Sequence, residues 1–151
     1  PFDESQLLAE NAEHESVKMQ FKLIQSKNLD KNELWKSVAN QISNFSEEDY
    51  QQLIPLILDQ NIPNLQSQIV AGKLTYEKLT QWYLYRIVKF ENDSTKALNA
   101  IISLNPNAVA QAKEKDKTRK EGDHPIFGIP VLLKDNINTE CMISTSGAHV
   151  L

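Results

Sequence analysis

The sequence predicts an α/β protein in which a helical extension, residues 1–60, precedes the first helices and strands of a mixed sheet, residues 61–151. Three observations support this prediction. Apolar residues recur at helical spacing through most of residues 30–90. A strand-like segment, a helix and a second strand-like segment then follow one another. The second of these segments, 126–133, is apolar on both faces, as in strands that are covered by helices on both sides.

Two helices are predicted between residues 30 and 60. Asp30 and Glu33 are placed like a capping box for the first, and Ser46 with Asp49 is a similar start for the second. The apolar face of the first helix consists of Leu34, Val38 and Ile42, beside Trp35. The apolar face of the second consists of Tyr50, Leu53, Ile54, Ile57 and Leu58. Pro55 lies inside this second pattern and is expected to kink or divide the helix.

Two more helices are predicted before residue 91. A short one follows Ile62 and Pro63 and ends at Gly72, which is a residue type favoured just after a helix. A longer one begins after Thr75 as its N-cap residue. Its aligned side chains are Leu79, Tyr83, Arg86 and Phe90. Residues 1–28 have weaker periodicity, carried by Val17, Phe21 and Ile24, and predict a loosely attached helix.

The second half of the chain changes character. Residues 92–94 indicate a turn, and residues 99–104 read as a short strand that Asn105-Pro106 closes. A helix is then expected from Ala108 through the charge-rich run Lys113–Glu121, with Gly122 after it. The apolar strand 126–133 completes the order strand, helix, strand.

Composition narrows the classes of function. The chain has 151 residues, 40% of them hydrophobic and 24% charged, which is typical of a globular domain. A net charge of −4 indicates neither a nucleic-acid nor a membrane partner. The run Lys113–Glu121 mixes both signs without aromatic residues, so we interpret it as a solvated helix face. The compartment stays open, with the cytoplasm slightly favoured.

Most reactive residue types have an ordinary explanation here. Cys141 is the single cysteine and no base is placed near it in the sequence, so a structural thiol is favoured over a nucleophile. The three histidines, His14, His124 and His149, are too scattered for a metal site. The four glycines form no phosphate-binding cluster. The sequence therefore predicts neither a metal nor a cofactor.

Lys134 is the strongest candidate for a functional side chain. It ends the strand 126–133, and a lysine there must either reach water or be held neutral by its surroundings. Most such lysines are solvated. However, the strand is of a buried type, and Asp135-Asn136 and Ser144–Gly147 supply hydrogen-bonding groups nearby. A desolvated lysine loses its proton more easily and can act as a base.

These segments resemble the N-terminal part of the amidase signature family. Residues 128–137 read GIPVLLKDNI and residues 144–147 read STSG, similar to the family pattern G-(I/V)-P-x-x-x-K-D-N followed by T-T-x-G-S. Upstream, residues 72–75 read GKLT and residues 83–87 read YLYRI, which resemble the family's first helix pair. Residues 98–102 resemble the strand that follows, together with Ala108, Ala112 and Asp116 in the next helix. The resemblance covers about residues 60–151 in the right order.

The resemblance implies a serine hydrolase that cleaves carboxylic amides through a Ser–cis-Ser–Lys triad, with Lys134 as the lysine. A bridging serine would pass a proton to Lys134 while the second serine attacks the carbonyl carbon. In the family both serines lie in a later G-G-S-S-G-G segment, and the chain ends at Leu151 without one. Ser144 and Ser146 do not replace them. We therefore expect the N-terminal portion of an amidase, inactive alone, that acts on a small-molecule amide as part of its parent protein.

Two alternatives remain open at this stage. Residues 30–90 could form a non-catalytic helical module that recruits a partner, with Lys134 merely solvated. The chain could also be a split or degenerate amidase subunit that only binds. Because strand 126–133 is suited to a covered sheet, we expect the isolated chain to self-associate. Replacing Lys134 by alanine distinguishes a catalytic from a solvated lysine.

Overall fold

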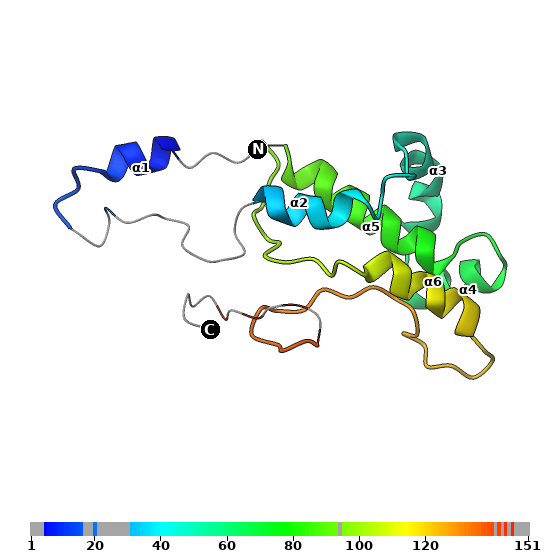
Figure 1. Ribbon diagram of the computed structural model, residues 1–151. Coiled ribbons are helices and arrows are strands. Elements are labelled where there is room, and N and C mark those ends of the chain that lie inside the picture. Colours follow the sequence, from blue (N-terminus) through cyan, green and yellow to red (C-terminus); the bar gives the residue numbers. More distant parts are fainter. Residues whose placement is uncertain are drawn as a thin grey trace.

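The computed structural model describes residues 5–16, 20, 31–93, 95–140, 142, 144 and 146. Within these residues the chain forms helices joined by loops (Figure 1). The helices are α1 (Ser5–Asn11), α2 (Lys31–Ala39), α3 (Glu47–Ile57), α4 (Ile62–Val70), α5 (Tyr76–Glu91) and α6 (Ala108–Thr118). None of the described helices combines the length and the apolar character that crossing a membrane requires.

Helix α5 is the centre of the arrangement. It is the longest described helix, with 16 residues, and α6 packs against it most extensively. Helix α3 also packs on α5, and α4 packs on α3 (Figure 1). Helix α1 lies apart from this group. The helical bundle therefore consists of α2 to α6, organised around α5.

Local capping explains where α3 and α4 begin. The Ser46 hydroxyl accepts from the Asp49 backbone N–H at 3.1 Å, and Asp49 accepts from the Ser46 N–H at 2.8 Å, which is a complete capping box. The predicted helix start at Ser46 is confirmed. Asn61 caps α4 in the same way by accepting from the Asn64 N–H at 2.9 Å. Pro63 lies in the first turn of α4, where its missing N–H costs nothing.

The start of α5 receives both a local and a distant cap. The predicted N-cap Thr75 accepts from the Lys78 N–H at 3.0 Å. The carboxylate of Asp116, on α6, accepts from the N–H groups of Tyr76 and Glu77 at 2.8 and 2.9 Å. Three of the N–H groups that a helix start leaves without intrahelical partners are therefore satisfied. A carboxylate at this position also complements the positive end of the helix dipole.

The start of α6 depends on a side chain from another part of the chain. Its N-cap residue, Asn107, makes no capping hydrogen bond with its side chain. Instead, Gln41 Oε1 accepts from the Val109 N–H at 3.0 Å, and Gln41 Nε2 donates to the Asn105 carbonyl at 3.1 Å. Gln81 on α5, which is buried, donates to the Gln41 carbonyl at 3.2 Å. This polar junction joins the end of α2, α5 and the start of α6.

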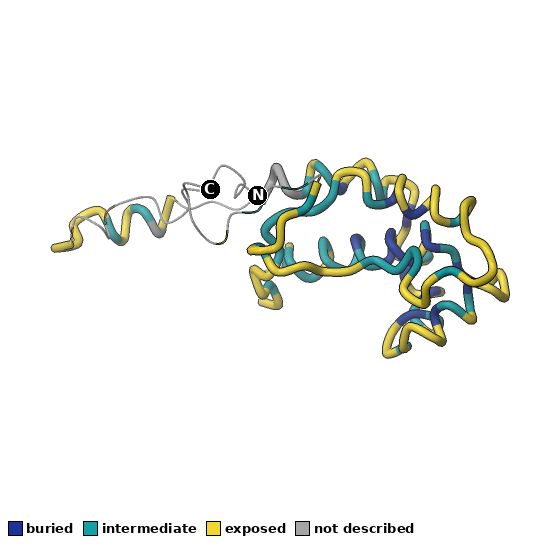
Figure 2. Tube along the Cα trace, turned by 90° about the horizontal axis from the view of Figure 1, so that it is seen from below, coloured by how far each residue is buried: buried dark blue, intermediate teal, exposed yellow. Residues whose placement is uncertain are grey.

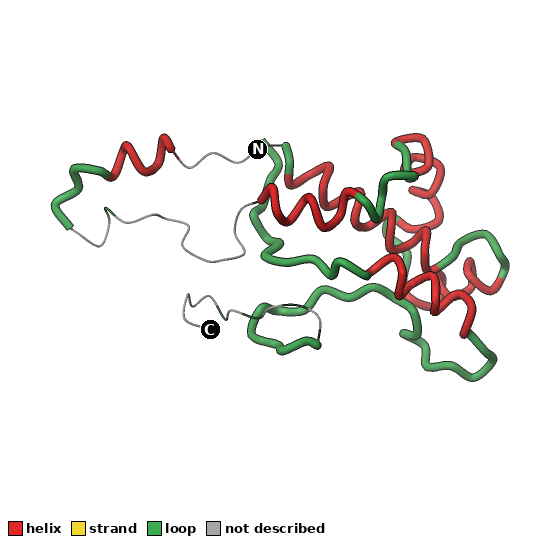
Figure 3. The backbone as a smooth tube through the Cα atoms, in the orientation of Figure 1, coloured by secondary structure: helices red, strands yellow, loops and turns green. Residues whose placement is uncertain are grey.

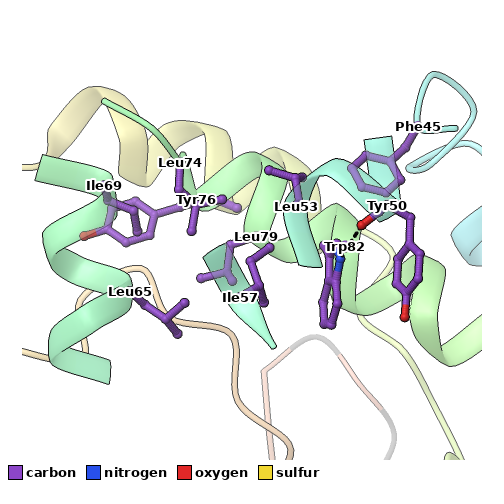
Figure 4. Packing of buried hydrophobic residues seen from close by; sticks show 11 residues of the cluster. Phe45, Tyr50, Leu53, Ile57, Leu65, Ile69, Leu74, Tyr76, Leu79 and Trp82 are labelled. Carbon is purple, nitrogen blue, oxygen red and sulfur yellow. Dashed lines mark hydrogen bonds between the residues drawn. The ribbon is translucent and has the colours of Figure 1, made fainter. Parts of the chain in front are cut away.

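The hydrophobic core lies between α3, α4, α5 and α6 (Figure 4). Its buried members are Phe45, Tyr50, Leu53, Ile57, Leu65, Ile69, Leu74, Tyr76, Leu79, Trp82 and Ala112. A smaller cluster of Val38, Leu84 and Val109 joins α2, α5 and α6. Helix α5 contributes to both clusters. Residues on both sides of position 60 share the larger cluster, so the predicted extension and the following segment pack as one unit here.

Aromatic contacts fix α3 against α5. The Tyr50 and Trp82 rings stack with centroids 5.0 Å apart, and Trp82 Nε1 donates to the Tyr50 carbonyl at 3.0 Å (Figure 4). Arg86 donates to the Tyr50 hydroxyl at 2.7 Å, and its guanidinium lies over the rings of Trp82 and Phe90. A half-buried arginine is suited to this position because it can stack and donate at once.

The two predicted strands are not strands in this structure (Figure 3). Residues 99–104 run irregularly between α5 and α6, with Asn99 at a φ of 52° and Leu104 packed on the smaller cluster. Residues 126–128 belong to a turn, and 129–134 are irregular. The physical reason is that a strand needs a hydrogen-bonded neighbour, and the described residues offer none.

Other expectations were met in part. Helix α3 runs through Pro55 and ends two residues later, so the proline does not divide it. Tyr50, Leu53 and Ile57 are buried as predicted, whereas Leu58 is 37% exposed. Gly72 follows α4 with a φ of 71°, as predicted for a residue after a helix. Helix α6 ends at Thr118, before the predicted end at Glu121, and Gly122, with a φ of 84°, lies in a turn beyond it. Asp30, Val17, Phe21 and Ile24 lie outside the described residues.

Replacing Asp116 by alanine should destabilise the bundle. The change removes two charge-assisted hydrogen bonds from the start of α5. We expect the free energy of unfolding to fall by about 1–2 kcal/mol, the usual cost of losing a helix cap. Urea unfolding measures it. Glu121→Ala, an exposed acidic residue near the end of α6, is the control and should change stability by less than about 0.5 kcal/mol. Equal effects of the two changes would contradict the capping role.

The ion pair between α3 and α5 should make stability depend on pH. Lys89 and Tyr85 donate to the Glu47 carboxylate, and the hydrogen bond from Lys89 is the main cause that lowers the pKa of Glu47 from 4.5 to about 2. A carboxylate with a lowered pKa in the folded state stabilises it above the unfolded pKa. That stabilisation is lost as the pH falls toward the folded pKa.

The stability difference between wild type and Glu47→Gln should therefore be largest above about pH 5 and vanish near about pH 2. Urea unfolding at several pH values tests this. Glu48→Gln, in the same first turn, is the control because Glu48 accepts from the neutral amide of Gln52. A difference for Glu47→Gln that stays constant from pH 2 to 7 would show that the ion pair does not form.

Candidate functional site

Two successive turns begin the segment that leads to Lys134. The Phe127 N–H donates to the His124 carbonyl at 2.8 Å, and the Ile129 N–H donates to the Ile126 carbonyl at 3.1 Å. Gly128 is the third residue of the second turn and has a φ of 73°, in the left-handed region that favours glycine. The glycine at the head of the GIPVLLK stretch is therefore required by a turn, where we had predicted a strand.

Gly128 also lies against the face of Tyr76. A Cβ atom on Gly128 would come within 2.7 Å of three carbon atoms of the Tyr76 ring. That separation is well below van der Waals contact, so no larger residue fits without movement. The Tyr76 ring is 1% exposed and belongs to the main core (Figure 4). The segment is thus pressed directly onto the core at the start of α5.

Further side-chain contacts attach the turn at Gly128 to α4, α5 and α6. Gln66 on α4 donates through Nε2 to the carbonyls of Pro125 and Phe127, at 2.8 and 3.0 Å. Its Oε1 accepts from the Tyr76 hydroxyl at 2.8 Å. The Phe127 ring meets the Tyr76 ring edge-on, with centroids 5.9 Å apart, and Lys115 lies over Phe127 at 4.8 Å. Burial raises the pKa of the Tyr76 hydroxyl, which favours the protonated form that donates to Gln66.

Beyond Ile129 the segment leaves the core (Figure 2). The exposed fractions of Val131, Leu132 and Leu133 are 65%, 75% and 49%. Lys134 is exposed as well. The burial that the sequence predicts for the segment before the lysine is therefore absent beyond Ile129, and of the two possibilities stated for Lys134 this structure has the one in which it reaches water. An apolar run of this kind at the surface is unusual in a stable protein and marks a surface suited to being covered.

The chain after Lys134 folds back on itself. The Ile137 N–H donates to the Lys134 carbonyl at 2.9 Å, which closes a turn over Asp135 and Asn136. The Ser144 hydroxyl donates to the Ile137 carbonyl at 3.0 Å, and the Ser146 N–H donates to the Asp135 carbonyl at 3.3 Å. The structure therefore brings the serine segment to the turn that follows Lys134, as the sequence suggested.

The remaining candidates are not assembled into a site. Cys141 and His149 lie outside the described residues. His14 and His124 are exposed and lie on separate segments. In the part of the chain that the structure describes, no group of three or more His, Cys, Asp or Glu side chains could hold a metal ion.

Sequence reasoning gave no role to three residues that matter most here. Gln66 and Tyr76 hold the turn before Lys134, and Asp116 holds Tyr76. Asp116 was noted only as part of a family pattern. Their roles depend on partners 10 to 61 positions away, and local spacing carries no signal for such contacts. The Tyr76–Gly128 contact had one available signal, because a glycine often marks a close approach.

Comparisons with known proteins agree on one family. The Amidase family matches residues 78–151, which include the turn at Gly128 and Lys134. This part of the chain belongs to the amidase family. The predicted membership is thereby confirmed for residues 78–151.

Several curated relatives carry the same description. A glutamyl-tRNA(Gln) amidotransferase subunit of Lysinibacillus sphaericus is 35% identical over 96 residues, 63% of this chain and 19% of that protein. The protein of the same name from Exiguobacterium sibiricum is 32% identical over 95 residues, also covering 63% and 19%. The chain thus spans about a fifth of the length of the curated relatives that it matches.

A solved structure extends the likeness. An amidase family protein from Bacillus anthracis matches with a TM-score of 0.74 and 32% identity, over 82% of this chain and 25% of that protein. Residues 61–151 make up only about three-fifths of this chain. The structural likeness therefore includes part of the helical segment before residue 61.

Replacing Gly128 by alanine should release the segment from the core. The added Cβ meets the Tyr76 ring and also strains a φ of 73°. Gly122→Ala is the matched control, because Gly122 has a φ of 84° but nothing within 4 Å of the added Cβ. Both variants lose about 1 kcal/mol through strain, and Gly128→Ala should lose about 1–3 kcal/mol more through overpacking. Urea unfolding measures the difference, and equal losses would argue against the ring contact.

Proposed function

We propose that Lys134 is the proton-accepting base of an amide hydrolase. The observation that carries the proposal is the family match, because it spans Lys134 together with the GIPVLLKDNI stretch around it. Two features of the structure support it. The stretch is anchored at Gly128, and the turn after Lys134 is bonded to Ser144 and Ser146. A lysine on a segment that is held on both sides can be placed in a defined position for proton transfer.

The proposed chemistry is acyl transfer to serine. Lys134 takes a proton through a bridging serine from a second serine, whose oxygen attacks the amide carbon. The amine leaves with a proton, and water then hydrolyses the acyl-enzyme. Backbone N–H groups would stabilise the negative oxygen of each tetrahedral intermediate. No Gly-Gly-Ser-Ser-Gly-Gly stretch occurs in residues 1–151, so we expect this chain alone to be inactive.

We further propose that residues 129–133, the part of the predicted strand 126–133 that follows the turn at Gly128, become a strand of a sheet in the complete gene product. Relatives are about five times as long as the matched part, so they have room for the neighbouring strands. Val131, Leu132 and Leu133 are exposed here on successive positions, which is the pattern of a strand that is covered on both faces. Residues 61–151 would then form the beginning of an α/β domain after the helical extension 1–60, of which residues 38–57 contribute to the shared core.

The proposed substrate is a small-molecule amide. Relatives are named for glutamyl-tRNA(Gln), yet the described part of this chain offers little support for binding a nucleic acid through α6. Lys113 is paired with Glu77 and Lys117 with Glu114, so the basic side chains of that helix are partly neutralised. The net charge of −4 also disfavours binding to the phosphate backbone of a nucleic acid.

The isolated chain should self-associate. Val131 and Leu132 are 65% and 75% exposed, and their backbone can pair with a second copy. Light scattering at micromolar concentration should give a dimer or a larger species. Leu132→Lys, which places a charge on the exposed run, should shift the chain toward monomer. A wild-type chain that stays monomeric over this range would contradict the prediction.

Replacing Lys134 by alanine in the complete gene product tests the catalytic proposal. A fluorophosphonate probe labels a serine only when a base activates it, so it needs no knowledge of the substrate. We expect labelling to slow by at least about a hundredfold in Lys134→Ala. Lys120→Ala, another exposed lysine, should label like wild type, and thermal unfolding should show that both variants are folded.

Labelling that is unchanged in Lys134→Ala would overturn the proposal. The second candidate, a non-catalytic helical module, would then be preferred. It is favoured by one observation, namely that the helices α2 to α6 have a core of their own while Lys134 is exposed. An absence of labelling in the wild-type complete gene product would point to the same module.

A further inference from the structure

The side-chain amide of Gln66 bonds the turn before Lys134 through its nitrogen and Tyr76 through its oxygen. An amide offers two N–H donors and a carbonyl acceptor. Both donors are used, toward the carbonyls of Pro125 and Phe127 at 2.8 and 3.0 Å. The acceptor receives the Tyr76 hydroxyl at 2.8 Å. The opposite amide orientation would place an oxygen against two carbonyl oxygens, so the network permits one orientation.

The carbonyls of this turn divide between two kinds of partner. Those of His124 and Ile126 accept from backbone N–H groups within the turns. Those of Pro125 and Phe127 accept from Gln66. Gln66 thus supplies hydrogen-bond donors for the two carbonyls that do not accept within the turns.

The contacts with Tyr76 and Gln66 can form in only one register of residues 125–128 relative to the bundle. Moving the chain by one residue would place Phe127 or Ile129 against the Tyr76 ring, where only a glycine fits. It would also present the wrong carbonyls to Gln66. A shift of one residue in a strand turns every side chain to the opposite face. In the proposed strand 129–133, the anchor would therefore determine to which face each side chain points, and so the side from which Lys134 leaves the strand.

We infer that Gln66, held by the Tyr76 hydroxyl, is a positioning residue that sets the register of the segment carrying Lys134. The inference rests on the proposed function, because the register matters for catalysis only when Lys134 is the base. Gln66 touches neither substrate nor the lysine amine; it acts through the backbone of residues 125–128. Tyr76 in turn is held by Asp116, so the register is transmitted from the junction of α5 and α6.

Two variants in the complete gene product test the inference. Gln66→Met keeps the side-chain length and removes all three hydrogen bonds, whereas Tyr76→Phe removes one and keeps the ring against Gly128. Gln68→Met, on the same helix, is the matched control. Fluorophosphonate labelling is measured against probe concentration, so that the maximal rate per labelled site is separated from probe binding. Amide hydrogen exchange of Ile129 and residues 131–134 reports, independently of activity, how firmly the segment is held.

We expect Gln66→Met to lower the maximal labelling rate by about tenfold to a hundredfold, the scale of a small misplacement, with half-saturating probe concentration changed less than about twofold. Exchange at Ile129 and residues 131–134 should become faster. Tyr76→Phe should also lower the maximal labelling rate and speed up exchange, but by less. Gln68→Met should change neither the labelling rate nor the exchange rate. A residue that served stability alone would reduce the amount of folded protein and leave the maximal rate per labelled site unaltered.

The outcomes separate this inference from the proposed function. If Lys134→Ala still labels like wild type, the proposed function fails, and faster exchange in Gln66→Met would leave only the register contact standing. If Lys134→Ala abolishes labelling while Gln66→Met keeps the wild-type rate and exchange, the positioning role is wrong although the function stands.

Discussion

The contact between the Tyr76 ring and Gly128 is the constraint on which the candidate site depends. Tyr76 is the first residue of α5, and Asp116 bonds its backbone N–H, so both helices at the centre of the bundle fix its position. The ring is buried, and its face leaves no room for a side chain on residue 128. A helical core and an exposed segment are thereby joined at one point, with Gln66 bonding the backbone on the same side.

The contact between Tyr76 and Gly128 lies at the boundary between a well-packed part of the chain and an exposed part. The bundle has its own apolar core and its own caps, and stacking of Tyr50 on Trp82 ties α3 to α5. The segment after Ile129 has neither buried side chains nor a paired strand in the described residues. We interpret the bundle as a unit that folds on its own core, and the segment after Ile129 as a part whose apolar side chains need other segments to bury them. Residues 78–151 match the amidase family, and this range includes both the segment and Lys134.

The sequence predicted what is decided locally. The capping box of Ser46 and Asp49 forms because its partners lie three residues apart, and Thr75 begins α5 for the same reason. It could not predict that Asp116 caps a helix 40 positions away, because that bond depends on how α5 and α6 cross. The strand predicted over 126–133 is absent from the described residues, although its sequence is apolar on both faces. Strand structure belongs to a pair of segments, and the described residues contain no partner.

The most direct test of the account is a crystal structure of the complete gene product, read at the amine of Lys134. The account predicts that residues 129–133 form a strand between two others and that Lys134 Nζ lies about 2.6–3.2 Å from a serine oxygen. The anchor of Gly128 on Tyr76 should be unchanged. An exposed segment with Lys134 Nζ in open solvent would contradict the account and would leave the helical bundle as a module that binds without catalysis.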